Sequence, residues 1–335
     1  MNSGAELLFH GSVPRRRASD TIHIGLVNNM PDAALRATEI QFARLLKDAA
    51  GPIDVRLRLF SFPEIVRSEL AQSRMEGHYA NAAALPDAQI DAVIVTGAEP
   101  IAADLRDEAY WQSFAKLVDW AQTGTVSTLF SCLAAHAAVL HMDGIKRRFL
   151  PHKLSGVFDC DDASDDALLL GSHGSAAVPH SRHNELAEKD LTAKGYSVLS
   201  RLRDGGVNLF AREEQSLFVF LQGHPEYDRE TLGREYCRDI GRFLRGERNE
   251  MPAMPQNYFD PATQNALRDL NEKGRDPALL PHYSEIAGRA LPLRIWRDQS
   301  VNLFGNWLAL IAAEKARRRS RESAETVQRN LRRSA

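Results

Sequence analysis

Residues 125–140, which read TVSTLFSCLAAHAAVL, decide the fold of this chain. The first residues form an apolar, β-branched run that is typical of a buried strand, whereas residues 133–140 are rich in Ala and Leu, which favour a helix. Cys132 lies where the strand gives way to the helix. A sharp strand-to-helix turn lifts its central side chain out of the sheet, and the helix N-terminus favours a thiolate and can bind an oxyanion. We therefore expect Cys132 to be a nucleophile.

The other two cysteines lack this setting. Taken alone, a free cysteine after an apolar strand is more often a small core residue than a nucleophile, and only the turn at Cys132 reverses that expectation. Cys160 lies between Asp159 and Asp161, whose negative charges disfavour a thiolate, and Cys237 lies inside a predicted helix. We interpret Cys160 and Cys237 as bystanders.

Strands and helices alternate on both sides of this turn. The hydrophobic pattern predicts strands at 21–28, 54–60 and 90–97, and helices at 36–47, 110–122 and 229–244. This order predicts an α/β fold, a doubly wound, mostly parallel sheet in three flavodoxin-like layers with helices on both faces. Short strands and turns between 153 and 220 complete the sheet. Because sites gather at the C-terminal ends of such strands, Thr96, Gly97 and Cys132 should be neighbours.

The chain divides into four parts. We expect a flexible N-terminal segment at 1–20, a catalytic domain at 21–248, a C-terminal extension at 249–318 and a disordered basic tail at 319–335. The extension ends in a predicted helix at 300–318, which packs on the main domain or on a second subunit of a homodimer. The tail is interpreted as a solvated end.

Composition restricts the function. The 335 residues are 44% hydrophobic and 26% charged, as in ordinary globular proteins, and the net charge of −2 predicts no general attraction to nucleic acid or to a membrane surface. Three scattered cysteines form no disulfide framework, and no segment resembles a signal peptide or an apolar membrane span. We expect a cytoplasmic protein with small-molecule substrates.

A histidine and a carboxylate follow a later strand. His224 comes after the apolar run at 217–221 and a glycine, so it should emerge at a strand end. Pro225 keeps the segment extended or turned, and in an extended chain residues two apart point to the same side. Glu226 can therefore hold the imidazole of His224, which predicts a Cys132–His224–Glu226 triad. The alternative is a structural His–Glu contact in a surface turn.

The remaining histidines suggest no metal site. His136 and His141 form one pair and His180 and His183 form another, but no carboxylate or thiol spacing completes a set of ligands. We expect no metal and no bound cofactor.

Nine segments, spread in order along the chain, match the sequence pattern of one known family. They are 24–31 (IGLVNNMP), 96–98 (TGA), 127–132 (STLFSC), 153–158 (KLSGVF), 179–182 (PHSR), 223–228 (GHPEYD), 235–239 (EYCRD), 257–259 (NYF) and 306–308 (NWL). In these segments the chain resembles the homoserine O-acyltransferases (O-succinyltransferases and O-acetyltransferases) of methionine biosynthesis, whose fold is similar to class I glutamine amidotransferases.

The resemblance implies ping-pong transfer of an acyl group from acetyl-CoA or succinyl-CoA to the hydroxyl of homoserine. Cys132 would carry the acyl-thioester, His224 would be the base and Glu226 would support it. Lys153, Ser181 and Arg238 would contact the substrates, and the two cations suit an amino-acid carboxylate.

An oxyanion formed in this reaction needs backbone N–H donors. We expect them from Leu133 and from the turn near Ala98 and Glu99.

Three positions depart from the family pattern. Leu133 and His136 stand where members usually have Trp and Gln, and Ile101 occupies the position that helps to choose the acyl group, with Gly for succinyl and Glu for acetyl. A branched apolar side chain would fill space and offer nothing to a succinyl carboxylate, which favours acetyl. Serine stays open as an acceptor, because one methylene gives only about 1 to 3 kcal/mol of discrimination.

Three other functions fit parts of the sequence. A glutamine-hydrolysing amidotransferase shares the turn and the His-x-Glu arrangement, but Phe130 and Ala134 occupy the positions of its usual glycines. A non-catalytic relative would explain the altered residues Leu133, His136 and Ile101. Nucleic-acid binding would depend on the arginine-rich tail alone.

Overall fold

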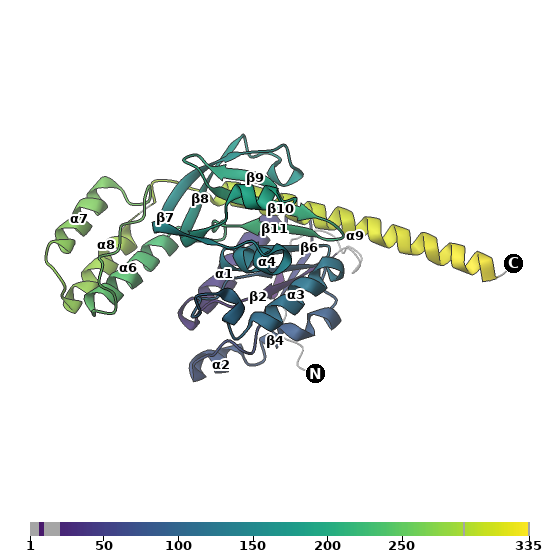
Figure 1. Ribbon diagram of the computed structural model, residues 1–335, viewed down its shortest axis with the longest axis horizontal. Helices are drawn as coiled ribbons and strands as arrows, with labels where there is room; N and C mark the ends of the chain where they lie inside the picture. The colour runs from purple at the N-terminus through teal and green to yellow at the C-terminus, as the bar shows by residue number, and fades with distance from the viewer. Residues whose placement is uncertain (1–6, 10–20, 291, 334–335) are drawn as a thin grey trace.

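The computed structural model describes residues 7–9, 21–290 and 292–333, and within them an 11-stranded sheet runs through the molecule (Figure 1). The strands are β1 Leu7–Phe9, β2 Ile22–Val27, β3 Val55–Ser61, β4 Tyr79–Asn81, β5 Ala92–Val95, β6 Ser127–Ser131, β7 Arg148–Asp162, β8 Ser175–Glu185, β9 Ser197–Leu202, β10 Val207–Glu213 and β11 Leu217–Leu221.

The α-helices are α1 Asp32–Ala49, α2 Glu69–Met75, α3 Trp111–Gly124, α4 Leu133–Asp143, α5 Glu188–Thr192, α6 Thr231–Leu244, α7 Pro261–Asn271, α8 Leu280–Arg289 and α9 Arg297–Arg333. Short 3₁₀ turns lie at Ala82–Asp87, Leu105–Asp107, Ala167–Leu169 and Pro277–Leu279.

The sheet order is β1-β3-β2-β5-β6-β11-β10-β9-β7-β8, with β4 beside β3. The strands from β3 through β2, β5 and β6 to β11 are parallel, and the pairs beyond β11 are antiparallel. The predicted doubly wound α/β sheet is thus confirmed, and its parallel half is the part that carries Cys132 at a strand end.

Helices cover both faces of the sheet, as the apolar spacing predicted. On one face, α1 and α9 bury Phe42, Phe304 and Trp307 against the strands, and Trp307 Nε1 donates to Ser127 Oγ at 2.8 Å. On the other face, α3 and α4 pack through Phe114 and small residues of α4. Complete burial of each large apolar side chain stabilises the fold by about 1.5 to 3 kcal/mol, so both helical layers are firmly attached.

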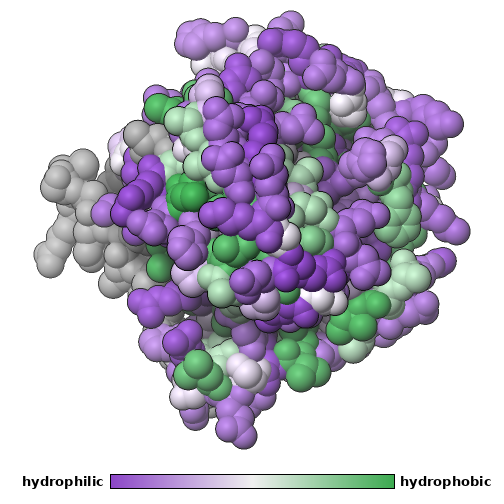
Figure 2. Space-filling model, turned by 90° about the vertical axis from the view of Figure 1, so that its left-hand side faces the viewer, coloured by the Kyte–Doolittle hydropathy of each residue, from purple (hydrophilic) through white to green (hydrophobic). Residues whose placement is uncertain are grey.

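A second helical group, α6 to α8, packs around a separate apolar cluster beside β7 (Figure 1). Tyr258 and Tyr283 are fully buried there, together with Leu267. Viewed from this end, the surface is mainly hydrophilic, with apolar side chains scattered among polar ones (Figure 2). Helices α7 and α8 were not predicted, although Asp260 accepts from the Thr263 N–H at 3.0 Å and Pro261 follows it, a standard helix start.

The two ends of the chain differ from expectation. The tail at 319–335 was expected to be disordered, but α9 continues to Arg333 and projects beyond the sheet (Figure 1), and the last two residues lie outside the described part. The tail is rich in Ala, Glu, Gln and Arg, which favour a helix. The turn of α9 just before the tail is stabilised as well, because Glu314 pairs with Arg317 and Arg318. In the segment at 1–20, residues 7–9 form β1 and the others lie outside the described residues.

The long antiparallel pair β7 and β8 also replaces the short strands expected after 153. In the part of the chain that the structure describes, no helix is long and apolar enough to cross a bilayer.

Candidate active site

Cys132 occupies a strained turn between β6 and α4. Its backbone has φ 51° and ψ −110°, a conformation that L-residues rarely adopt and that costs about 1 to 3 kcal/mol. The Cys132 N–H donates to the Leu221 carbonyl at 2.7 Å, which fixes the turn to the neighbouring strand. The side chain is half-buried and lies at the N-terminus of α4, as a nucleophile elbow requires.

Strand register brings two other segments to the same edge. Val95 pairs with Phe130, and Leu221 pairs with Ser131, so the segments that follow β5 and β11 flank Cys132. A Cβ on Gly97 would lie 2.7 Å from Leu133 Cβ and 3.2 Å from Leu133 N. The turn after β5 therefore approaches the first turn of α4, as the strand pattern predicted.

His224 and Glu226 are joined as expected. His224 Nδ1 lies 2.8 Å from Glu226 Oε1, and the side chains are 9% and 5% exposed. Burial alone would lower the pKa of His224, but the charges of Glu226 and Cys132, and the contacts with both, raise it well above its ordinary value. Glu226 Oε2 is buried and has no hydrogen-bond partner. The structure thus brings the three predicted catalytic residues together.

Tyr227 and Glu235 support the imidazole, and the sequence did not single them out. The Tyr227 ring stacks on His224 with 4.3 Å between centroids, and its hydroxyl donates to Glu235 Oε1 at 2.8 Å. The Ser181 hydroxyl donates to Glu235 Oε2. Glu235 therefore ties Ser181 to the residue that packs on the base.

Lys153 and Arg238 converge on one carboxylate. Lys153 Nζ lies 2.8 Å from Asp239 Oδ2, and Arg238 Nη2 lies 3.0 Å from Asp239 Oδ1. Burial would raise the pKa of Asp239, but the two cations hold it below its usual value. The structure thus groups the two predicted substrate-binding cations, and it pairs both with an acid that the sequence did not single out.

The turn after β5 carries the predicted oxyanion and acyl-specificity residues. Glu99 reaches α6, where its Oε1 lies 3.5 Å from Arg242 Nη1. Glu108 Oε1 accepts the backbone N–H groups of Ile101 and Ala102, each at 2.7 Å. Ile101 itself is 96% exposed and fills no enclosed space, so the structure gives no support to the steric argument for acetyl that was drawn from its size.

Two further buried side chains, His136 and Arg182, lie near Cys132. His136 Nε2 lies 3.0 Å from Gln222 Oε1, and complete burial lowers the pKa of His136 to about 3. Arg182 is 4% exposed, donates to the Asn184 carbonyl at 2.7 Å and to His180 Nδ1 at 3.3 Å, and lies within electrostatic reach of Cys132. The buried guanidinium of Arg182 therefore places a positive charge near the thiol of Cys132.

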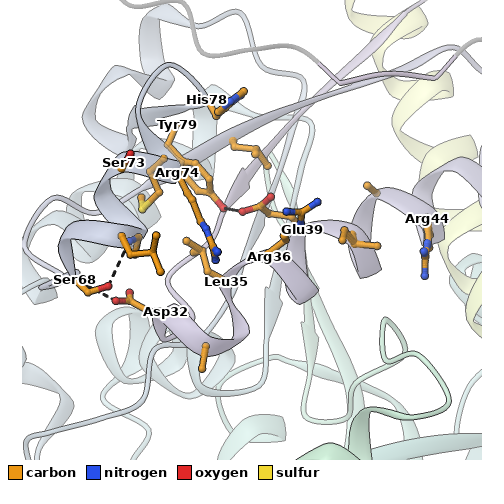
Figure 3. Close-up of a pocket in the computed structure, with 17 residues that line it drawn as sticks. Asp32, Leu35, Arg36, Glu39, Arg44, Ser68, Ser73, Arg74, His78 and Tyr79 are labelled. Atoms are coloured by element: carbon orange, nitrogen blue, oxygen red, sulfur yellow. Dashed lines mark hydrogen bonds between the residues drawn. The ribbon is translucent and has the colours of Figure 1, made fainter.

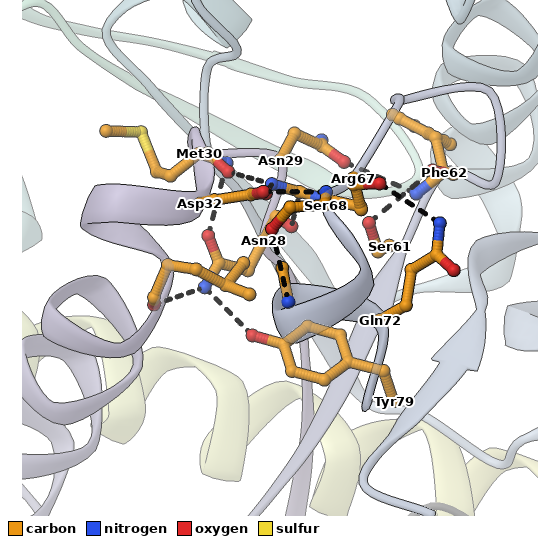
Figure 4. Close-up of polar contacts among 12 residues, drawn as sticks. Asn28, Asn29, Met30, Asp32, Ser61, Phe62, Arg67, Ser68, Gln72 and Tyr79 are labelled. Atoms are coloured by element: carbon orange, nitrogen blue, oxygen red, sulfur yellow. Dashed lines mark hydrogen bonds and ion pairs between the residues drawn. The ribbon is translucent and has the colours of Figure 1, made fainter. Parts of the chain in front are cut away.

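The loop after β2 is held at the same edge by a polar network (Figure 4). The buried Arg67 donates to the carbonyl groups of Asn28 and Met30 and lies 3.2 Å from Asp32 Oδ1. Asn29 N donates to Thr96 Oγ1 at 2.8 Å, which ties this loop to the turn after β5. The IGLVNNMP segment thus braces the site from one side.

A groove of about 880 Å³ lies elsewhere, between α1, α2 and β4 (Figure 3). Arg36, Arg74 and His78 line it, and Tyr79 donates to Glu39 at 2.7 Å across it. None of the predicted site residues lines this groove. Among the residues with described placement, no group of three His, Cys, Asp or Glu side chains could hold a metal ion.

Comparison with known proteins agrees with the resemblance seen in the sequence. Residues 8–317 match the family model of homoserine O-succinyltransferase. The chain is 50% identical to the homoserine O-succinyltransferase of Rhodopseudomonas palustris, over 90% of this chain and 92% of that protein, and 48% identical to that of Bradyrhizobium japonicum, over 89% and 93%.

Among solved structures, the chain is similar to a glutamine amidotransferase from Methylobacillus flagellatus, with a TM-score of 0.47 and 15% identity over 87% of this chain and 95% of that one. The family match spans both the site and the C-terminal helices. This chain belongs to the homoserine O-succinyltransferase family.

Proposed function

We propose that the protein transfers a succinyl group from succinyl-CoA to the side-chain hydroxyl of L-homoserine, a step of methionine biosynthesis. The observation that carries the proposal is the placement of Cys132 in a strained turn beside the buried His224–Glu226 pair. The choice of succinyl follows the names of the related proteins, which this chain matches over most of its length.

In the first half-reaction the Cys132 thiolate attacks the thioester carbonyl of succinyl-CoA. The carbonyl becomes an oxyanion, for which the N–H groups of Leu133 and of the turn at Ala98 and Glu99 are the donors. The bond to the CoA sulfur then breaks, the CoA sulfur takes a proton from His224, and the succinyl group stays on Cys132 as a thioester. The raised pKa of His224 suits this donor role.

In the second half-reaction the neutral imidazole of His224 removes the proton from the homoserine hydroxyl. The oxygen attacks the thioester, and Cys132 leaves as a thiolate. Glu226 stabilises the imidazolium formed at this point, because its carboxylate already accepts from Nδ1 at 2.8 Å.

The acceptor is held by the cations next to the base. Lys153 and Arg238 share Asp239, so the acceptor carboxylate would join an existing cluster of two cations and one acid. Arginine binds a carboxylate through two parallel N–H groups, which orients the amino acid and its hydroxyl toward His224. Ser181 and Glu235 lie beside Tyr227 and supply further polar contacts.

The direct test combines the full chain with succinyl-CoA and L-homoserine and measures free CoA and O-succinylhomoserine. Cys132→Ala should abolish both products. L-serine replaces homoserine in a parallel reaction and distinguishes the two acceptors. If no hydroxy amino acid supports CoA release above the Cys132→Ala background, the proposal is wrong.

A further inference from the structure

Glu235 is a half-buried acid whose direct partners are neutral. Its Oε1 accepts from the Tyr227 hydroxyl at 2.8 Å, and its Oε2 accepts from the Ser181 hydroxyl. Over the described residues 7–9, 21–290 and 292–333, no Lys, Arg or His forms an ion pair with Glu235. A carboxylate has about four acceptor sites, and the two hydroxyls leave the others and the negative charge unused. Glu235 can therefore accept from a further donor that carries a positive charge.

This carboxylate faces the same space as the two predicted substrate-binding cations. On α6, Glu235 lies three residues before Arg238 and four before Asp239, so the three side chains share one face of the helix. In the ladder of β7 and β8, Ser181 lies opposite the residue two positions after Lys153, which puts Lys153 and Ser181 on the same side of this strand pair. The contacts of Ser181 with Glu235 and of Lys153 with Asp239 both join this side to α6.

The catalytic base lies next to the same cluster. The Tyr227 ring, whose hydroxyl donates to Glu235, stacks on His224 with 4.3 Å between centroids. The His224 N–H donates to the Pro179 carbonyl at 2.8 Å, two residues before Ser181 on β8. A group bound at Glu235 is therefore close to the imidazole that takes the proton of the acceptor hydroxyl.

The other acids of this cluster are already occupied. Asp239 pairs with two cations, and Glu226 is 4% exposed and holds His224. An amino acid at neutral pH carries an ammonium on the same carbon as its carboxylate, and burial of that ammonium without an acceptor is costly. Glu235 is both accessible and free of a cation, so it is the acid that suits this group.

We infer that Glu235 binds the α-ammonium of the acceptor amino acid while Arg238 binds its carboxylate. The inference rests on the proposed function and names the residue that makes the site select an amino acid over a simple hydroxy acid. Residues three apart on a helix have Cβ atoms about 5 to 6 Å apart, which suits two charges carried by one carbon. A site built to pair with a charged group of its substrate discriminates against an analogue without it.

The test starts from the Cys132 acyl-enzyme, formed with succinyl-CoA and freed of CoA. L-homoserine or 4-hydroxybutyrate, which has hydrogen in place of the ammonium, is added, and loss of the acyl mass gives the discharge rate. In Glu235→Gln, which removes the charge but keeps the size, we expect kcat/KM for homoserine to fall about 10- to 100-fold, as for loss of a contact with a charged group. The rate with 4-hydroxybutyrate should not change. The loss should be mainly a raised KM, because the ammonium is bound alike before and during the reaction.

Three variants serve as controls. Glu247→Gln lies beyond the end of α6, where Glu247 pairs with Arg245 at 2.6 Å, and it should keep the wild-type preference for homoserine. Tyr227→Phe removes one hydroxyl contact but leaves the carboxylate, so the ratio of the two discharge rates should stay unchanged. Glu235→Asp keeps the charge and should retain more of the preference than Glu235→Gln. If Glu235→Gln does not fold, a raised KM for homoserine alone in Glu235→Asp carries the test.

The outcomes separate this inference from the proposed function. Equal losses with both acceptors, or a lower kcat at unchanged KM, would show that Glu235 only positions Tyr227 and the base, and would overturn the inference. Wild-type discharge by homoserine in a Glu235→Gln variant with wild-type thermal unfolding would overturn it as well. If the wild type forms no acyl-enzyme, or homoserine does not discharge it, the proposed function fails instead.

Discussion

His224 Nδ1 and Glu226 Oε1 lie 2.8 Å apart at the end of β11, with both side chains more than nine-tenths buried. Pro225 keeps His224 out of a helical conformation, and the Tyr227 N–H donates to the His224 carbonyl at 3.2 Å, so a tight turn over Pro225 and Glu226 brings the two side chains together. Burial alone would lower the pKa of His224, but the carboxylate of Glu226 and the charge of Cys132 raise it well above its ordinary value. The pair thus holds a strongly basic imidazole beside Cys132.

Glu226→Gln should therefore lower the pKa of His224 while it preserves the shape of the site. The imidazolium then loses its proton at a lower pH, so the positive charge beside Cys132 disappears sooner as the pH rises. We expect kcat to fall about 10²- to 10⁴-fold, the usual contribution of such proton transfer. The pH profile of iodoacetamide alkylation of Cys132 checks this: an unchanged profile in Glu226→Gln would contradict the assigned role.

Cys132→Gly should abolish activity but stabilise the protein. Glycine adopts φ 51° at no steric cost, whereas Cys and Ala are strained there. Both Cys132→Gly and Cys132→Ala lack the sulfur, so the difference between their free energies of unfolding reports the strain of the backbone at this position. We expect the glycine variant to have a free energy of unfolding higher by about 1 kcal/mol, measured in urea. Equal stability of the two variants would show that the turn stores no strain.

Gly97→Ala should damage the oxyanion site. The added methyl would lie 3.2 Å from Leu133 N and 2.7 Å from Leu133 Cβ, so it blocks that N–H or pushes α4 away. We expect kcat/KM for acyl-enzyme formation to fall about 10²-fold, as when one oxyanion donor is lost. Gly288→Ala on α8, where the new methyl meets nothing within 4 Å, is the control. A fully active Gly97→Ala enzyme would rule out Leu133 as a donor.

His136→Gln should reduce acid sensitivity. In the folded protein the pKa of His136 is about 3, against 6.5 when it is exposed, so between these values the unfolded chain binds the extra proton. The free energy of unfolding therefore decreases as the pH falls below 6.5, by up to about 1.4 kcal/mol per pH unit for this group. His224 has the opposite sign: its contribution is complete below 6.5 and is lost as the pH rises through its higher folded value.

Denaturant unfolding at pH 5 and pH 8 measures the effect of His136→Gln. At pH 8 the histidine is neutral in both states, so the difference between variant and wild type there reports packing alone. The decrease from pH 8 to pH 5 should be smaller in the variant. An identical decrease would mean that His136 takes up its proton without unfolding.

The parts of the site that the sequence predicted are formed by residues that lie close together in the chain. The strand-to-helix change at Cys132 and the two-residue spacing of His224 and Glu226 are local patterns, and parallel strand order then brings their edges together. The Thr96–Gly97 turn follows from the same register. These features need no knowledge of side chains far away in the chain.

The contacts that were missed join distant residues. Glu235 meets Ser181 across 54 positions, and His136 meets Gln222 across 86, so no local spacing marks them. Arg182 resembles an ordinary surface cation in the sequence, and only its burial distinguishes it. The helix at 319–333 was missed for another reason, because a run of charges was interpreted as solvated coil although its residues favour a helix.

Intact-mass spectrometry of the protein mixed with succinyl-CoA, without an acceptor, tests the central claim most directly. We predict a mass increase equal to one succinyl group, located on Cys132 after digestion, absent in Cys132→Ala and discharged when L-homoserine is added. A protein that releases CoA but never carries the acyl group, or that carries it on another residue, would contradict transfer through a Cys132 thioester.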